Sequence, residues 1–195
     1  MFAMKLTVFL AIFICASVAG VVAQERPQGA ATADSGNWIN VAPADQGFTV
    51  LMPGKATEQS QPLGSDARVE NHLLTLDTSL AGYVVSYVQF PDEVTDPAAI
   101  KELLDRGRDG GVQSSNGQLK SEKEITLKGF SGREWVMTLP GNLAARARAY
   151  WVKRRLYQIV FVVKEEGTIT PAERKLRQDA ESKFFDSFTL SDEIK

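Results

Sequence analysis

Short stretches of alternating apolar and polar residues precede the first helical pattern of the chain. Phe48–Met52 alternates with a period of two, and Pro53 and Gly54 end this segment as a turn. Residues 69–76 and 83–90 also have an extended pattern. The second of these is β-branched or aromatic on both faces, which is typical of a strand inside a sheet. These patterns predict three strands before the first helix.

Two segments have the spacing and the end signals of amphipathic helices. The first is predicted to begin at Pro97, behind the capping residue Asp96, and to end among the glycines at 107–111. The second begins with a capping box at residues 170–173, in which a proline takes the first helical position. Its buried side is predicted to consist of residues spaced four apart: Leu176, Ala180 and Phe184.

Four more strands are predicted between the two helices. They cover residues 119–127, 130–139, 144–152 and 156–163. The last two form a hairpin around Lys153, Arg154 and Arg155. Because few strands are separated by a helix, we expect a mostly antiparallel sheet flanked by helices. The sequence thus predicts a single α+β domain over residues 38–195.

The first 23 residues differ from the rest of the chain. Lys5 is their single charge, an apolar run follows it, and the run ends in small residues up to Ala23. This order is typical of a secretory signal peptide, which predicts an exported protein, periplasmic or extracellular. The alternative is an uncleaved membrane anchor over residues 1–23, although the run is shorter than the ~20 residues of a typical span. Residues 24–37 are poor in apolar types and are predicted to form a flexible leader.

The composition excludes several classes of function. The chain has 22 Lys and Arg against 24 Asp and Glu and no concentrated basic face, so nucleic acid is not an expected partner. Its one cysteine, Cys15, lies in the predicted signal peptide, and its one histidine is His72, so neither a disulfide nor an ordinary zinc site is expected. The motifs G-x-S-x-G and H-E-x-x-H do not occur, and Thr49 stands where a phosphate loop needs glycine. We therefore expect no cofactor, no metal and no catalytic residue.

Two local features have candidate chemistry, and a structural role is the expectation for both. His72 shares a strand face with Leu74, and a general base would need a nucleophile within hydrogen-bond reach. A hard cation would suit the acidic residues of one loop, Asp92, Glu93 and Asp96. Their spacing does not match an EF-hand, and Asp96 is expected to cap the helix that follows.

A basic hairpin is the strongest candidate for a binding site. Its residues are Arg146, Arg148, Tyr150, Lys153, Arg154 and Arg155. A cationic surface with an aromatic side chain suits an anionic partner, such as an acidic lipid headgroup or a polyanionic glycan. The alternative is a solvated hairpin tip whose charges discourage edge-to-edge pairing. Alanines at 145, 147 and 149 on the opposite face indicate that a helix packs closely there.

Four short blocks are spread over nearly the whole predicted domain: Trp38, Gly47–Gly54, Gly129–Trp135 and Phe185–Leu190. Together they resemble small secreted bacterial proteins of the PsbP-like type. The resemblance implies an antiparallel sheet sandwiched by helices (an α/β/α sandwich) and a non-catalytic accessory or binding role. PsbP itself assists the oxygen-evolving complex of photosynthesis, and none of its functional residues can be matched in this sequence.

The sequence therefore favours an exported, non-catalytic binding or accessory domain of the cell envelope, with an envelope protein or an anionic molecule as its partner. A membrane is an expected partner only if residues 1–23 stay uncleaved. The alternative function is a hydrolase whose site consists of Asp and Glu residues. Such a site needs two carboxylates facing each other at a separation of ~5–10 Å.

Overall fold

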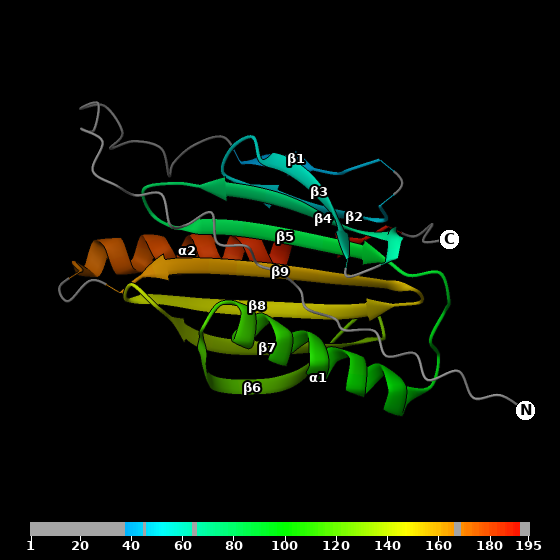
Figure 1. Cartoon of the computed structure of the whole chain (residues 1–195). Helices are drawn as coiled ribbons and strands as arrows, with labels where there is room; N and C mark the ends of the chain where they lie inside the picture. Colours follow the sequence, from blue (N-terminus) through cyan, green and yellow to red (C-terminus); the bar gives the residue numbers. More distant parts are fainter. Residues whose placement is uncertain (1–37, 45, 64–65, 166–168, 192–195) are drawn as a thin grey trace, which may run out of the picture.

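Seven antiparallel strands form the central layer of the computed structural model (Figure 1). In chain order they are β3 (Thr57–Leu63), β4 (Asp66–Asp77), β5 (Gly82–Gln89), β6 (Gln118–Leu127), β7 (Phe130–Leu139), β8 (Leu143–Val152) and β9 (Arg155–Lys164). They lie side by side in the order β3-β4-β5-β9-β8-β7-β6. The structure describes residues 38–44, 46–63, 66–165 and 169–191, and describes 66–68 by their backbone. The predicted signal peptide (1–23) and leader (24–37) lie outside the described residues.

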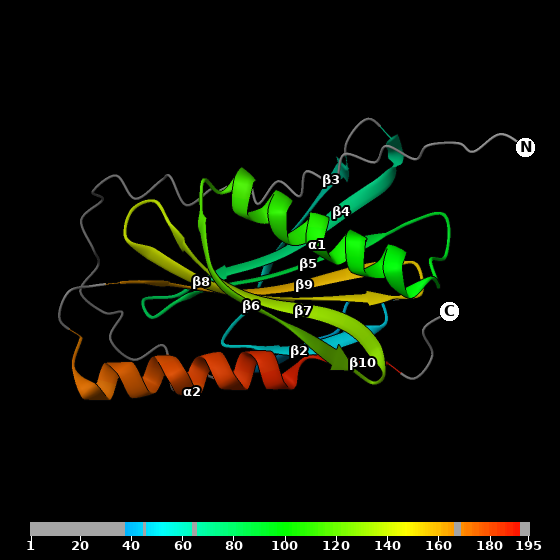
Figure 2. The same cartoon turned by 90° about the horizontal axis from the view of Figure 1, so that it is seen from below.

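Two helices and a small sheet cover the faces of this layer. They are α1 (Pro97–Ser114), α2 (Pro171–Ser187), β1 (Ile39–Val41), β2 (Phe48–Met52) and β10 (Thr189–Leu190). Helix α1 lies on one face, over β7 and β8, whereas α2 and the small sheet β1-β2-β10 lie on the other face (Figures 1 and 2). The prediction of an α+β domain with an antiparallel sheet flanked by helices is therefore confirmed.

Aromatic rings fill the space between the large sheet and α2. Phe48, Tyr83, Tyr157 and Phe184 are at most 1% exposed. The rings of Tyr83 and Phe184 meet edge to face, with their centroids 5.2 Å apart. Burying one such large apolar side chain contributes about 1.5–3 kcal/mol of hydrophobic free energy. The larger of the two cores in the described residues lies on this face.

The core beneath α1 combines two large rings, those of Trp135 and Trp151, with small side chains. Alanines at 145, 147 and 149 are at most 2% exposed and lie on the face of β8 that α1 covers, as the alternation predicted. The prediction that glycines end this helix is wrong, because α1 continues through them to Ser114. Gly107 and Gly111 are buried on the side of the helix that faces the sheet. The nearest atom to a Cβ at Gly111 would be Cζ2 of Trp135, 4.0 Å away.

Three strands are too short or too polar to show a clear alternation and were not predicted. β1 and β10 are only 3 and 2 residues long, and β3 is a polar edge strand with a single buried residue, Leu63. Pro62 lies in β3, where the register with β4 shifts between Pro62 and Leu63. An edge strand tolerates proline because the missing N–H is not needed by a second neighbour.

Both predicted helix starts are confirmed. Asp96 accepts a hydrogen bond from a backbone N–H of the first turn of α1, and residues 170–173 form the capping box of α2. Ala180 and Phe184 of α2 are buried as predicted, whereas Leu176 is 51% exposed. Within the ranges that the structure describes, no helix is long and apolar enough to cross a membrane.

Candidate functional site

The predicted basic hairpin is formed by β8 and β9, which Lys153 and Arg154 join. Lys153 has a left-handed φ of 58° in this turn. The carbonyl groups of the turn accept hydrogen bonds from the segment that follows β5: the N–H of Phe90 donates to Arg154 at 2.8 Å, and that of Val94 donates to Lys153 at 3.3 Å. These backbone hydrogen bonds hold the turn against the segment that leads from β5 to α1.

Two arginines of the hairpin lie beneath α2. Arg146 pairs with Glu181 of α2, with Nε and Oε1 3.2 Å apart. Arg148 donates from Nε to Oε2 of Glu134 at 2.7 Å, and its guanidinium lies 4.7 Å from the centroid of the Phe185 ring. Both cations therefore have partners within the domain, which connect β7, β8 and α2.

Tyr150 lies on the same face and is 5% exposed. Its ring stacks on that of Phe188, with centroids 6.0 Å apart. Burial raises the pKa of the Tyr150 hydroxyl. The structure thus separates the six candidate residues into two groups: Arg146, Arg148 and Tyr150 against α2, and Lys153, Arg154 and Arg155 at the turn.

A polar cleft of about 440 Å³ opens beside the β8–β9 turn. Its lining comes from separate parts of the chain: Gln46, Glu70, His72, Gln89, Phe90, Pro91 and Arg154. The cleft unites two residues that the sequence singled out for different reasons, His72 and Arg154. The strand register produces this arrangement, because Gln89 pairs with Arg155 while Asn71 pairs with Val88, so that the middle of β4 lies beside the end of β5 and the start of β9.

His72 has a defined orientation at the cleft. Its ring stacks on Tyr87, with centroids 4.7 Å apart and an angle of 5° between the planes. Nδ1 lies 2.7 Å from Oγ of Ser60, and Nε2 lies 3.7 Å from Oε2 of Glu70. Burial, followed by the nearby carboxylate of Glu58, raises the pKa of Tyr87 to about 12. The tyrosine beneath the imidazole therefore stays protonated at neutral pH.

Arg155 supports the cleft from below. It is buried and donates from Nε to Oε1 of Gln89 at 3.0 Å. Its Nη1 lies 3.5 Å from the hydroxyl of Tyr157, which in turn donates to the carbonyl of Gln46 at 2.6 Å. Arg155 thus positions two amide residues of the lining, and Arg154 is the predicted cation that itself lines the cleft.

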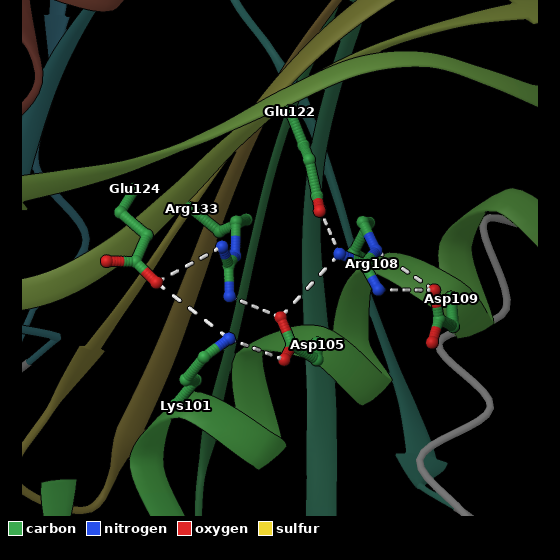
Figure 3. Close-up of polar contacts among 7 residues, drawn as sticks. All are labelled: Lys101, Asp105, Arg108, Asp109, Glu122, Glu124 and Arg133. Atoms are coloured by element: carbon green, nitrogen blue, oxygen red, sulfur yellow. Dashed lines mark hydrogen bonds and ion pairs between the residues drawn. The ribbon is translucent and has the colours of Figure 1, made fainter. Parts of the chain in front are cut away.

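A second concentration of charge joins α1 to β6 and β7 (Figure 3). Arg108 contacts Asp109 at 2.8 Å and also pairs with Glu122. Toward the start of the helix, Arg133 pairs with Asp105, and Lys101 lies 3.2 Å from the same carboxylate. The network therefore fastens the exposed edge of the sheet to the helix.

Asp105 is the anion shared by the three cations of this network. Burial by itself would raise its pKa, but the hydrogen bond with Lys101 and the charges of Arg133 and Arg108 outweigh burial and lower it. Sequence reasoning missed this network because its members come from α1, β6 and β7. The charged alternation of β6 was its only local signal, and that pattern is also typical of a solvated edge.

The lining of the cleft suits recognition by hydrogen bonds and one positive charge. Arg154 provides the cation, His72 and the two glutamines provide hydrogen-bonding groups, and Glu70 is the one carboxylate. Among the described residues, no group of three or more His, Cys, Asp or Glu side chains is arranged to hold a metal ion.

The three layers define the class of this domain, an α+β sandwich whose fold is similar to that of PsbP. Cyanobacterial PsbP (CyanoP) from Synechocystis has a similar structure, with a TM-score of 0.54, 13% sequence identity, and coverage of 85% of this chain and 97% of that one. The likeness shows a shared fold, which the sequence blocks had implied.

Two further solved structures are similar at lower scores. LpqN of Mycobacterium tuberculosis, described as involved in cell envelope biogenesis, has a TM-score of 0.43 and 14% identity over 80% of this chain and 91% of that one. A protein of unknown function from Pseudomonas aeruginosa has a TM-score of 0.39 and 10% identity over 75% and 92%. No family model and no curated protein sequence matches the chain.

Proposed function

We propose that this chain is an exported, non-catalytic binding domain of the cell envelope, and that the cleft beside the β8–β9 turn holds an anionic group of its partner. One observation carries the proposal: the fold brings Arg154 of the β8–β9 turn and His72 of β4 to one open polar cleft. The charge pattern of the first 23 residues supports export.

The charges of the cleft limit what it binds. Arg154 offers one guanidinium, whereas Glu70, which also lines the cleft, is half exposed and of opposite charge. A polyanion would meet repulsion from this carboxylate. A single carboxylate or phosphate group on a protein or glycan would pair with Arg154 and accept hydrogen bonds from the amide side chains.

Neither of the two cavities described here has the pair of carboxylates that the alternative function, a hydrolase, would need. Among the described residues, Glu70 is the one acid in the lining of the cleft, and Glu124 is the one acid in the lining of the cavity next to α1. Hydrolysis by paired carboxylates needs two acids in the same cavity. The geometry therefore favours binding over this type of catalysis.

Cross-linking in cells, followed by purification of the tagged chain and peptide mass spectrometry, tests the proposal. The partner recovered with the wild type should be lost with Arg154→Glu, because the substitution reverses the charge at the cleft. Arg174→Glu is the matched control, since it makes the same charge change at an exposed position of α2. Equal recovery with both variants would exclude the cleft as the binding site, and the mass of the isolated N-terminus distinguishes cleavage after Ala23 from an anchor.

A further inference from the structure

A second cavity lies between the start of α1 and the strands β6 and β7. Its volume is about 380 Å³, within the range of small-molecule sites in proteins. Leu104 and Pro97 contribute apolar groups, and Thr126 and Ser131 contribute hydroxyls. The cavity does not share a lining residue with the cleft beside the β8–β9 turn.

Two cations are held in fixed positions at this cavity. The Arg133 side chain is 6% exposed and pairs through Nη2 with Asp105, while Nε has no hydrogen-bond partner among the described residues. Lys101 contacts the other oxygen of Asp105 at 3.2 Å. Asp105 therefore orients both cations from one side and leaves donors of each for a second anion (Figure 3).

Glu124 occupies this second anion position, but its contacts are long. Its Oε1 lies 3.5 Å from Nη1 of Arg133 and 3.8 Å from Nζ of Lys101, and its side chain is 71% exposed. Charge-assisted hydrogen bonds are about 2.7–2.9 Å long. Exposed ion pairs contribute only about 0.2–1 kcal/mol, so the carboxylate of Glu124 is easily displaced.

We propose that this cavity binds a small organic acid, whose carboxylate replaces that of Glu124 between Lys101 and Arg133. A planar carboxylate matches the guanidinium, which is already oriented and desolvated by burial. The apolar part of the acid packs against Leu104 and Pro97, and Glu124 turns outward into solvent. Glu124 thus acts as an internal competitor for the site, independently of the partner proposed for the cleft.

Titration of the purified chain with hexanoate, followed by heteronuclear NMR, tests this site. Hexanoate should shift the amide signals of Thr126 and Ser131 with a saturable dependence in the millimolar range, whereas hexanol, which lacks the carboxylate, should not. Glu124→Gln should tighten hexanoate binding up to about fivefold, because it removes the competing charge. Lys101→Met should weaken binding about tenfold, because a charge-assisted contact is lost.

Lys120→Met on the exposed part of β6 is the control and should leave the affinity unchanged. A structural role for Glu124 would change thermal unfolding without tightening hexanoate binding, so unfolding is measured on the same samples. The proposal is overturned if hexanol binds as well as hexanoate, if Glu124→Gln does not tighten binding, or if neither the wild type nor this variant shows saturable shifts.

Discussion

The two faces of the seven-stranded sheet are packed in different ways. On the α2 face, large rings such as Phe48, Tyr83 and Phe184 interdigitate between the sheet, the helix and β2. On the α1 face, Gly111 and the alanines of β8 lie in a core that also contains Trp135, and ion pairs join the rim of α1 to β6 and β7. The α2 face is thus packed by a cluster of rings, whereas the α1 face combines the rings of Trp135 and Trp151 with small side chains and a charged rim.

This difference separates the sources of stability from the places where ligands can bind. Burial of rings contributes most of the hydrophobic free energy, whereas exposed ion pairs contribute little each. The α1 rim, where charges replace packing, also holds a cavity with oriented cations. We therefore expect substitutions on the α2 face to affect mainly stability, and substitutions at the α1 rim to affect mainly binding.

The largest effect is expected for Phe184→Ala. This side chain is fully buried in the aromatic core, so its removal leaves a cavity and should lower the free energy of unfolding by about 3–5 kcal/mol. Leu176→Ala is the control on the same helix, because Leu176 is 51% exposed and its loss should change stability by less than about 0.5 kcal/mol. Urea unfolding of both variants measures the difference, and equal losses would show that the rings do not dominate this face.

The second largest loss of stability is expected for Gly132→Ala, where β7 and β8 lie against the aromatic core. A Cβ at Gly132 would lie 2.5 Å from Cδ1 of Tyr150 and 2.6 Å from the carbonyl oxygen of Ala149. Gly132→Ala should therefore lower the free energy of unfolding by about 1–3 kcal/mol through overpacking. At Gly54 a Cβ would meet nothing closer than Leu76 at 3.6 Å, so Gly54→Ala is the matched control. Chemical denaturation measures the stability of both variants. If Gly132→Ala and Gly54→Ala are equally stable, this account of the packing is wrong.

Much of the fold could be predicted because apolar alternation is local. The strand predicted at 130–139 has the bounds of β7, since Trp135, Met137 and Leu139 recur on one side of it with a period of two. β3 could not be predicted in this way, because pairing with β4 makes it a strand while its side chains are polar. Such an edge strand is defined by its neighbour's hydrogen bonds, which no local pattern records.

Opposite pH effects are expected for two carboxylates on the α2 face. Burial alone would raise the pKa of Glu134, but hydrogen bonds with Arg148 and Lys123 outweigh it and hold this pKa below the ordinary value of 4.5. Burial raises the pKa of Glu181, and the charge of Arg146 offsets this only in part. Ionised Glu134 therefore stabilises the fold above about pH 4.5, and ionised Glu181 destabilises it there.

Glu134→Gln should consequently cost about 2 kcal/mol at pH 7, because charged hydrogen bonds are lost. The deficit should shrink as the pH falls through the lowered pKa of Glu134, where the wild type loses the same stabilisation. Glu181→Gln should raise stability at pH 7 by no more than about 1 kcal/mol, and this gain should vanish toward pH 4.5 as the wild type becomes protonated. Denaturation series at several pH values measure both changes in the free energy of unfolding. If both substitutions change stability in the same direction at pH 7, the opposite roles given to the two carboxylates are wrong.

The candidate sites were predictable only as single residues. A cation at position 154 follows from the turn between two apolar strands, but its position beside His72 depends on the register of β4, β5 and β9. The ion pairs of α1 with β6 and β7 likewise require the helix to lie on the sheet. The ion pairs of Arg146 and Arg148 with α2 have the same origin, since the helix that carries their partners begins at Pro171.

The smallest effect, of opposite sign, is expected within α1. Gly111 was predicted to help end the helix, yet it lies in the helix interior, where glycine costs about 0.5–1 kcal/mol relative to alanine. A Cβ at this position would lie 4.0 Å from Cζ2 of Trp135, an ordinary van der Waals distance. Gly111→Ala should therefore raise the free energy of unfolding by about 0.5–1 kcal/mol.

Gly111→Leu sharpens this prediction, because a longer side chain reaches past the Cβ toward Trp135 and should reverse the sign by overpacking. Thermal and urea unfolding of the two variants and the wild type measure whether each substitution raises or lowers the free energy of unfolding. If the alanine variant is also less stable than the wild type, then contact between the backbones of α1 and the sheet is closer than the Cβ distance indicates. In that case position 111 of the α1 face, like position 132 of the aromatic face, does not tolerate an added side chain.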